Sequence, residues 1–143
     1  MVRTALCLVV LVWAVALCVI DLRERRLPDA LTLSGAAVIL PFCAACGRGW
    51  PALLGAAALG GLYLAVHLAD PSAMGGGDVK LAVALGGLTG ALGAPVWVLG
   101  AVGAALLTAL CGTVAILRGR CGALPHGPSM CVASLIAASP AVF

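Results

Sequence analysis

The chain has 143 residues, of which 64% are hydrophobic and 9% are charged, and its mean hydropathy is +1.22. Soluble domains carry about 25% charged residues, so this composition excludes a water-soluble domain. The formal net charge of +3 is too small and too dispersed for nucleic-acid binding. The composition predicts an all-α, polytopic protein embedded in membrane lipid, formed by one domain over residues 1–143, and it leaves the oligomeric state open.

Six apolar stretches approach the length of about 20 residues that a membrane-spanning helix needs. The first runs over residues 4–20, the second over 30–46 with Pro41 inside it, and the third over 51–69. The fourth, 79–93, is short and interrupted by glycines, and stretches at 95–117 and 127–143 follow it. The sequence therefore predicts about six transmembrane helices with short connections.

The basic residues are distributed unequally between the two sides of the predicted bundle. The connections from the first to the second, the third to the fourth and the fifth to the sixth helix hold Arg23, Arg25, Arg26, Lys80, Arg118 and Arg120, whereas the opposite side holds Arg3 and Arg48. Positively charged connections remain in the cytoplasm when a membrane protein inserts. We therefore expect both termini outside, in a multi-pass protein of the inner (plasma) membrane.

Two aspartates lie at ends of predicted helices on the same, cytoplasmic side. Asp21 closes the first apolar stretch, and Asp78 follows Gly75, Gly76 and Gly77 and opens the fourth. An ionisable group at a membrane boundary is costly, which makes each aspartate a functional candidate. The structural alternatives are that Asp21 simply ends a helix at the headgroup level and that Asp78 caps one, as Asp29 is expected to do for the second helix.

The three glycines favour a functional role for Asp78. Ordering three successive glycines costs about 0.5–1 kcal/mol each relative to alanine, and a simple helix cap does not require them. Glycine permits a positive φ angle and close approach of another backbone. A connection that receives an extended peptide beside a carboxylate would use both properties.

A pair of neighbouring carboxylates can hydrolyse an amide. Like charges held close together share one proton, so the ionised partner can accept a proton from water while the protonated partner polarises a peptide carbonyl. Other hydrolytic constellations are missing, because His67 and His126 are the only histidines and neither lies in an HExxH motif. Cys43 and Cys46 have CxxC spacing without a second pair, so we expect no metal and no cofactor.

At these residues the chain resembles the type IV prepilin peptidases, membrane aspartyl proteases of the GxGD class. Asp21, the arginines after it and Leu27-Pro28-Asp29 resemble the first motif of that family. Gly75-Gly76-Gly77-Asp78-Val79-Lys80 resembles its GxGDxK motif, and Leu124-Pro125-His126-Gly127-Pro128 resembles the start of its last helix.

The resemblance implies that Asp21 and Asp78 are the catalytic pair, and that the substrate is a prepilin-like protein cleaved at the cytoplasmic face. It implies that Gly75, Gly76, Gly77 and Lys80 contribute to the substrate-binding region. Bifunctional members carry an additional N-terminal portion with paired CxxC motifs, so we expect no methyltransferase activity here. The short form resembles the peptidases of Flp/Tad pilus systems.

Two alternatives of other classes remain at this point. A small membrane transporter would use the aspartates as a proton relay or ion site, and it would favour carboxylates near the middle of helices and symmetry between two halves. A non-catalytic subunit of a pilus or secretion assembly would not need both aspartates together.

Overall fold

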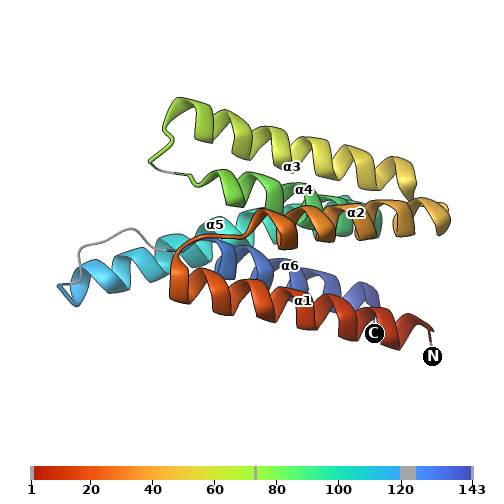
Figure 1. The fold of residues 1–143 in the computed structure, drawn as a ribbon, viewed down its shortest axis with the longest axis horizontal. Helices are drawn as coiled ribbons and strands as arrows, with labels where there is room; N and C mark the ends of the chain where they lie inside the picture. Colours follow the sequence, from red (N-terminus) through yellow and green to blue (C-terminus); the bar gives the residue numbers. More distant parts are fainter. Residues whose placement is uncertain (1, 73, 120–124, 143) are drawn as a thin grey trace.

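The computed structural model describes residues 2–72, 74–119 and 125–142, with side chains described between residues 7 and 141. These ranges contain six helices and no strand (Figure 1). The helices are α1 (Val2–Glu24), α2 (Asp29–Ala45), α3 (Gly49–Ala69), α4 (Gly76–Leu92), α5 (Ala94–Leu117) and α6 (Gly127–Val142). The predicted all-α fold with six helices is confirmed, and each boundary lies within four residues of the prediction.

Backbone chemistry explains where several helices begin and end. Arg25 adopts a φ of 51° and ends α1 while its amide still bonds to the Asp21 carbonyl at 2.9 Å. Pro28 precedes α2 in an extended conformation. The proline ring fixes the φ angle, which suits a residue at the start of a helix. The predicted capping by Asp29 is wrong, because Pro28 occupies the N-cap and Asp29 is the first helical residue. Gly93, with a φ of 122°, joins α4 to α5 in a conformation that favours glycine.

Helix α4 is the most deeply enclosed element of the bundle. It packs mainly against α3 and α2, and nine of its 17 residues are buried. A Cβ atom on Gly86 would lie 2.6 Å from the Gly55 carbonyl oxygen, and one on Gly90 would lie 2.8 Å from the Gly55 Cα. Small residues therefore let α3 and α4 approach closely. Membrane helices often pack in this way, because the surrounding lipid provides no hydrophobic effect that would favour helix association.

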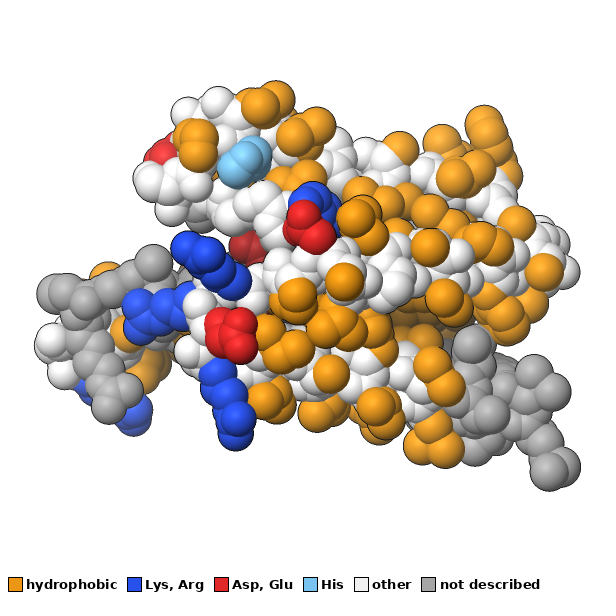
Figure 2. All heavy atoms as spheres, in the orientation of Figure 1, with side chains coloured by type: hydrophobic (Ala, Val, Ile, Leu, Met, Phe, Trp, Pro, Cys, Tyr) orange, Lys and Arg blue, Asp and Glu red, His pale blue; other side chains and the backbone are white. Residues whose placement is uncertain are grey.

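The outer surface of the bundle is apolar over most of its length. Large hydrophobic side chains are exposed on several helices, among them Val9, Leu62, Leu99, Leu106 and Ile136. Figure 2 shows this apolar surface, with charged side chains gathered toward one end. Within the described residues α3 and α5 are long and apolar enough to cross a membrane, and α2 and most of α6 are shorter apolar helices. Such exposure indicates a membrane protein.

The two ends of the bundle differ in charge. The α1–α2 and α3–α4 connections lie at one end with the C-terminus of α5, and the N-terminus and the α2–α3 connection lie at the other (Figure 1). The first end holds Arg23, Arg25, Arg26, Lys80 and Arg118. At the second end Arg48 donates from Nη1 to the Ala91 carbonyl oxygen at 2.8 Å. Arg3 and Arg120 lie outside the described side chains, and the outward N-terminus stays a prediction.

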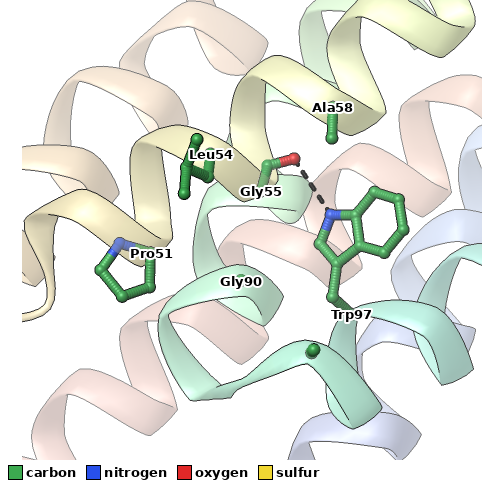
Figure 3. A pocket seen from close by; sticks show the side chains of 7 residues that line it. Pro51, Leu54, Gly55, Ala58, Gly90 and Trp97 are labelled. Carbon is green, nitrogen blue, oxygen red and sulfur yellow. Dashed lines mark hydrogen bonds between the residues drawn. The ribbon is translucent and has the colours of Figure 1, made fainter.

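An apolar groove of about 280 Å³ lies at the second end, between the start of α3 and the junction of α4 with α5 (Figure 3). Trp97 forms part of its wall and donates from Nε1 to the Gly55 carbonyl oxygen at 3.0 Å. Because Gly90 lines the groove and Asp78 lies at the opposite end of α4, the groove is separate from the aspartates.

Candidate active site

Asp21 lies in the last turn of α1, and its side chain is only 5% exposed. Its Oδ2 accepts a hydrogen bond of 3.1 Å from the backbone amide of Gly127, 106 residues later in the chain. Gly127 is the first residue of α6, where backbone amides have no partner within the helix. The start of α6 thus supplies a donor that favours the ionised form of Asp21.

Asp78 is the third residue of α4 and is half-buried. Its carboxylate accepts a hydrogen bond from the backbone amide of Gly75, the residue that caps this helix. A carboxylate that reaches back to the cap residue is one half of a capping box. The structural alternative for Asp78 therefore holds in part, because this side chain also satisfies the first turn of α4.

Leu27 brings the surroundings of the two aspartates together. A Cβ atom on Gly77 would lie 2.8 Å from the Leu27 Cβ, and one on Gly127 would lie 3.3 Å from the Leu27 Cδ1. Gly77 precedes Asp78, and Gly127 donates to Asp21. The first turns of α4 and α6 consequently meet on either side of Leu27, and the negative charge of Asp21 acts on Asp78.

The environment raises the pKa of both carboxyl groups, which lie at helix ends outside the apolar stretches. Burial is the main cause for Asp78, the negative charge of Asp21 adds to it, and together they raise its pKa to about 6 despite the Gly75 amide. Burial also raises the pKa of Asp21, while the Gly127 amide opposes that rise. Two nearby carboxyl groups with raised pKa values form a pair that holds a proton more readily than free aspartates do.

The three glycines before Asp78 serve the site differently from the prediction. None of them adopts a positive φ, because the positive angles among the described glycines belong to Gly47, Gly93 and Gly119. Gly76 and Gly77 are helical, so the expected glycine loop is in fact the first turn of α4. Gly77 lies against Leu27 of the same chain with no room for a side chain, and the approach of an extended substrate peptide stays a prediction. Gly75 is exposed beside the Asp78 carboxylate.

Other polar residues at this end form local contacts. Lys80 pairs with Asp29 at 2.6 Å, so its ammonium group is engaged by the start of α2 rather than extended into solvent. His67 donates from Nδ1 to the Met74 carbonyl oxygen at 2.7 Å. Asp70 accepts from the Ser72 amide at 2.9 Å and forms the turn after α3. The binding role of Lys80, Gly75, Gly76 and Gly77 stays a prediction.

Sequence reasoning did not predict the contacts that join three side chains near the start of α6. The His126 ring lies between the Tyr63 hydroxyl, 2.8 Å from Nε2, and the Thr108 hydroxyl, 2.6 Å from Nδ1. Burial lowers the pKa of His126, so the ring is neutral at neutral pH. The sequence feature that pointed to His126 was its position directly before Gly127 and Pro128, at the predicted start of the last helix. Leu124, the first residue of the motif at residues 124–128, lies outside the described residues.

One of the comparisons with known proteins identifies a family. The model of the type IV leader peptidase family matches residues 8–117, a range that contains both Asp21 and Asp78. No curated protein and no solved structure matches the chain. Since the matched range covers well over half of the 143 residues, the chain belongs to the type IV leader peptidase family.

Proposed function

We propose that this membrane protease is an aspartic endopeptidase in which Asp21 and Asp78 form the catalytic pair. The observation that carries the proposal is that a buried carboxyl group from α1 and a half-buried one from α4 lie near each other, close enough for the negative charge of Asp21 to raise the pKa of Asp78. A transporter would favour carboxylates near the middle of helices, and a passive assembly subunit has no need for such a pair at the charged end of the bundle. Perturbed pKa values of paired carboxyl groups are typical of acid–base sites.

The proposed reaction divides acid and base between the two residues. Asp78 carries the shared proton and donates it to the carbonyl oxygen of the scissile amide. Asp21, kept ionised by the Gly127 amide, takes a proton from the attacking water as its oxygen bonds to the carbonyl carbon. The resulting tetrahedral diol then breaks its C–N bond, and the leaving nitrogen receives the proton held by Asp21. One hydroxyl group of the diol returns its proton to Asp78 as the new carboxyl group forms, which restores the starting state of the pair. Exclusion of water by the bound peptide would raise the pKa of Asp78 above 6, toward the protonated form at neutral pH.

The proposed substrate is a prepilin-like membrane protein with a short basic leader before an apolar helix. The exposed apolar flank of the bundle suits an apolar substrate helix lying in lipid, and the charged end suits a junction at the headgroup level. The excess of basic residues at that end supports a cytoplasmic active site in the inner membrane. The scissile segment must unwind locally, because a helical amide is shielded and already hydrogen-bonded.

Single substitutions at the pair test the proposal. We expect Asp21→Asn and Asp78→Asn to abolish processing of a co-expressed prepilin while the proteins still accumulate in the membrane. Glu24→Gln is a matched control, since Glu24 is an exposed carboxylate one turn beyond Asp21 on the same helix. Continued processing by either aspartate variant would remove that residue from the catalytic role.

A purified-protein assay separates the alternatives. If the aspartates act without a metal ion, leader cleavage in detergent proceeds in the presence of a chelator. A non-catalytic subunit would leave the leader intact under all conditions. A transporter would show proton or ion flux in vesicles that depends on Asp21 and Asp78 without cleaving peptide.

A further inference from the structure

His126 connects three helices at the candidate site. Its Nε2 lies 2.8 Å from the hydroxyl of Tyr63 on α3, and its Nδ1 lies 2.6 Å from the hydroxyl of Thr108 on α5. The Tyr63 and His126 rings also pack together, with centroids 5.5 Å apart and an interplanar angle of 36°. A neutral imidazole has one donor and one acceptor nitrogen, and two hydroxyl groups satisfy both. The ring is thereby fixed in position and orientation.

The His126 backbone fixes the start of α6 as well. Its carbonyl oxygen accepts the amide of Met130 at 3.1 Å, as the first helical hydrogen bond of α6. The next residue, Gly127, donates its amide to Asp21. Glycine itself offers no side chain to hold that amide in place. The direction of the Gly127 N–H therefore depends on how firmly His126 is held.

We infer that His126 is a positioning residue of the peptidase site: held between Tyr63 and Thr108, it directs the Gly127 amide at the Asp21 carboxylate. The inference rests on the proposed catalytic role of Asp21. Among the described side chains, the His126 ring hydrogen-bonds to Tyr63 and Thr108 and not to either aspartate. It acts through one backbone hydrogen bond, which selects the ionised form of the base.

The groups that can titrate around Asp21 are few among the described residues. Asp78 faces it from α4, Cys18 lies one turn earlier on α1, and Cys131 faces it from α6. An assay at about pH 4–7 covers the range in which the carboxyl pair titrates. His126, whose pKa is lowered by burial, can titrate in the same range, so the Asp21 carboxylate has to be followed by its own resonance as well as by the rate. Loss of the Gly127 hydrogen bond would raise the pKa of Asp21, because that bond opposes the effect of burial. The acidic limb of the pH–rate profile should then move to higher pH.

Three variants on α5 test this inference. Thr108→Val removes a hydroxyl without changing the side-chain shape, Thr108→Ser keeps the hydroxyl, and Thr113→Val removes a hydroxyl that bonds only within α5. The substrate is a synthetic peptide with a basic leader, a glycine at the junction and an apolar segment. We expect Thr108→Val to lower kcat/KM by about tenfold, the size that loss of one hydrogen bond allows, and to shift the acidic limb upward. Thr108→Ser should restore the wild-type profile, and Thr113→Val should match wild type.

Two further measurements keep the inference open to refutation if Thr108→Val folds poorly. Tyr63→Phe removes the other partner of the ring and should shift the same limb in the same direction. Carbon-13 NMR titration should show a higher pKa for Asp21 in both variants, with the Asp21 resonance assigned by its loss in Asp21→Asn. A uniform loss of activity at every pH, with an unchanged Asp21 titration, overturns the positioning role. Cleavage by Asp21→Asn itself would instead overturn the proposed function.

Discussion

Gly127→Ala is the sharpest test of the geometry at Asp21. The residue lies at the start of α6 without a positive φ, so alanine suits its backbone conformation. The added Cβ atom, however, would lie 2.6 Å from Asp21 Oδ2 and 3.3 Å from both Asp21 Cγ and Leu27 Cδ1. The change therefore alters the position of the proposed base while leaving the helix able to form.

The required displacement follows from these distances. Ordinary contacts begin at 3.4 Å, so the carboxylate oxygen and the new methyl group must separate by about 0.8 Å, the difference between 3.4 and 2.6 Å. The Asp21 side chain is 5% exposed, so a buried carboxylate has to rotate or α6 has to shift. Either movement distorts the 3.1 Å bond from Gly127. A misplacement of about 1 Å costs roughly 100-fold in rate, and we expect a loss of that order in kcat/KM.

The assay compares purified Gly127→Ala with wild type on the same prepilin-like peptide in detergent. Gly61→Ala provides the control, because Gly61 lies on α3 and a Cβ atom there meets nothing within 4 Å. Melting temperatures of all three proteins establish that folding is retained. If Gly127→Ala is folded and cleaves within twofold of wild type, the base does not require the position that Asp21 holds here.

Three further outcomes are expected. Asp21→Asn should lower the pKa of Asp78 from about 6, but not to the ordinary value, because burial is the larger cause of the shift. An unchanged carbon-13 NMR titration of Asp78 would show that the pair does not interact. Because the folded protein binds the Asp78 proton more tightly than the unfolded chain, the melting temperature should rise as pH falls from about 7 to 5. The rise should be smaller in Asp78→Asn, and identical slopes of melting temperature against pH in the two proteins would contradict this. Lys80→Met removes the ion pair with Asp29, whose side chains are 38% and 64% exposed, so the free energy of unfolding should fall by less than about 1 kcal/mol. A large rise in KM with kcat unchanged would assign Lys80 to substrate binding.

The helices could be predicted from the sequence because the physical requirement is simple. Each apolar stretch needs a minimum length, and prolines, glycines and charges mark its ends. The same reasoning placed Asp21 and Asp78 at one end, since helices joined by short connections alternate in direction. Where predictions erred, neighbouring structure decided the outcome. Asp29 pairs with Lys80 instead of capping α2, and Gly76 and Gly77 join the helix that they were expected to precede.

The interactions that complete the candidate site have weaker signals in the sequence. The partner of Asp21 is a backbone amide, and every residue except proline has one. The contacts of His126 join α3, α5 and the start of α6, so they depend on the distances and rotations at which these helices pack. A sequence pattern can identify which residues carry chemistry, but it does not show which hydroxyl groups reach a given ring nitrogen.

The glycine content of the chain connects the packing of the bundle with its proposed chemistry. Gly55, Gly86 and Gly90 let α4 sit close against α3, and Gly77 lets the first turn of α4 meet Leu27. Larger residues at these positions would push α4 outward and carry Asp78 away from Asp21. In a lipid environment, such close packing between helices contributes to their association. The same small residues that stabilise the bundle therefore set the separation of the two carboxyl groups, so substitutions far from Asp78 along α4 should alter how strongly the pair shares its proton.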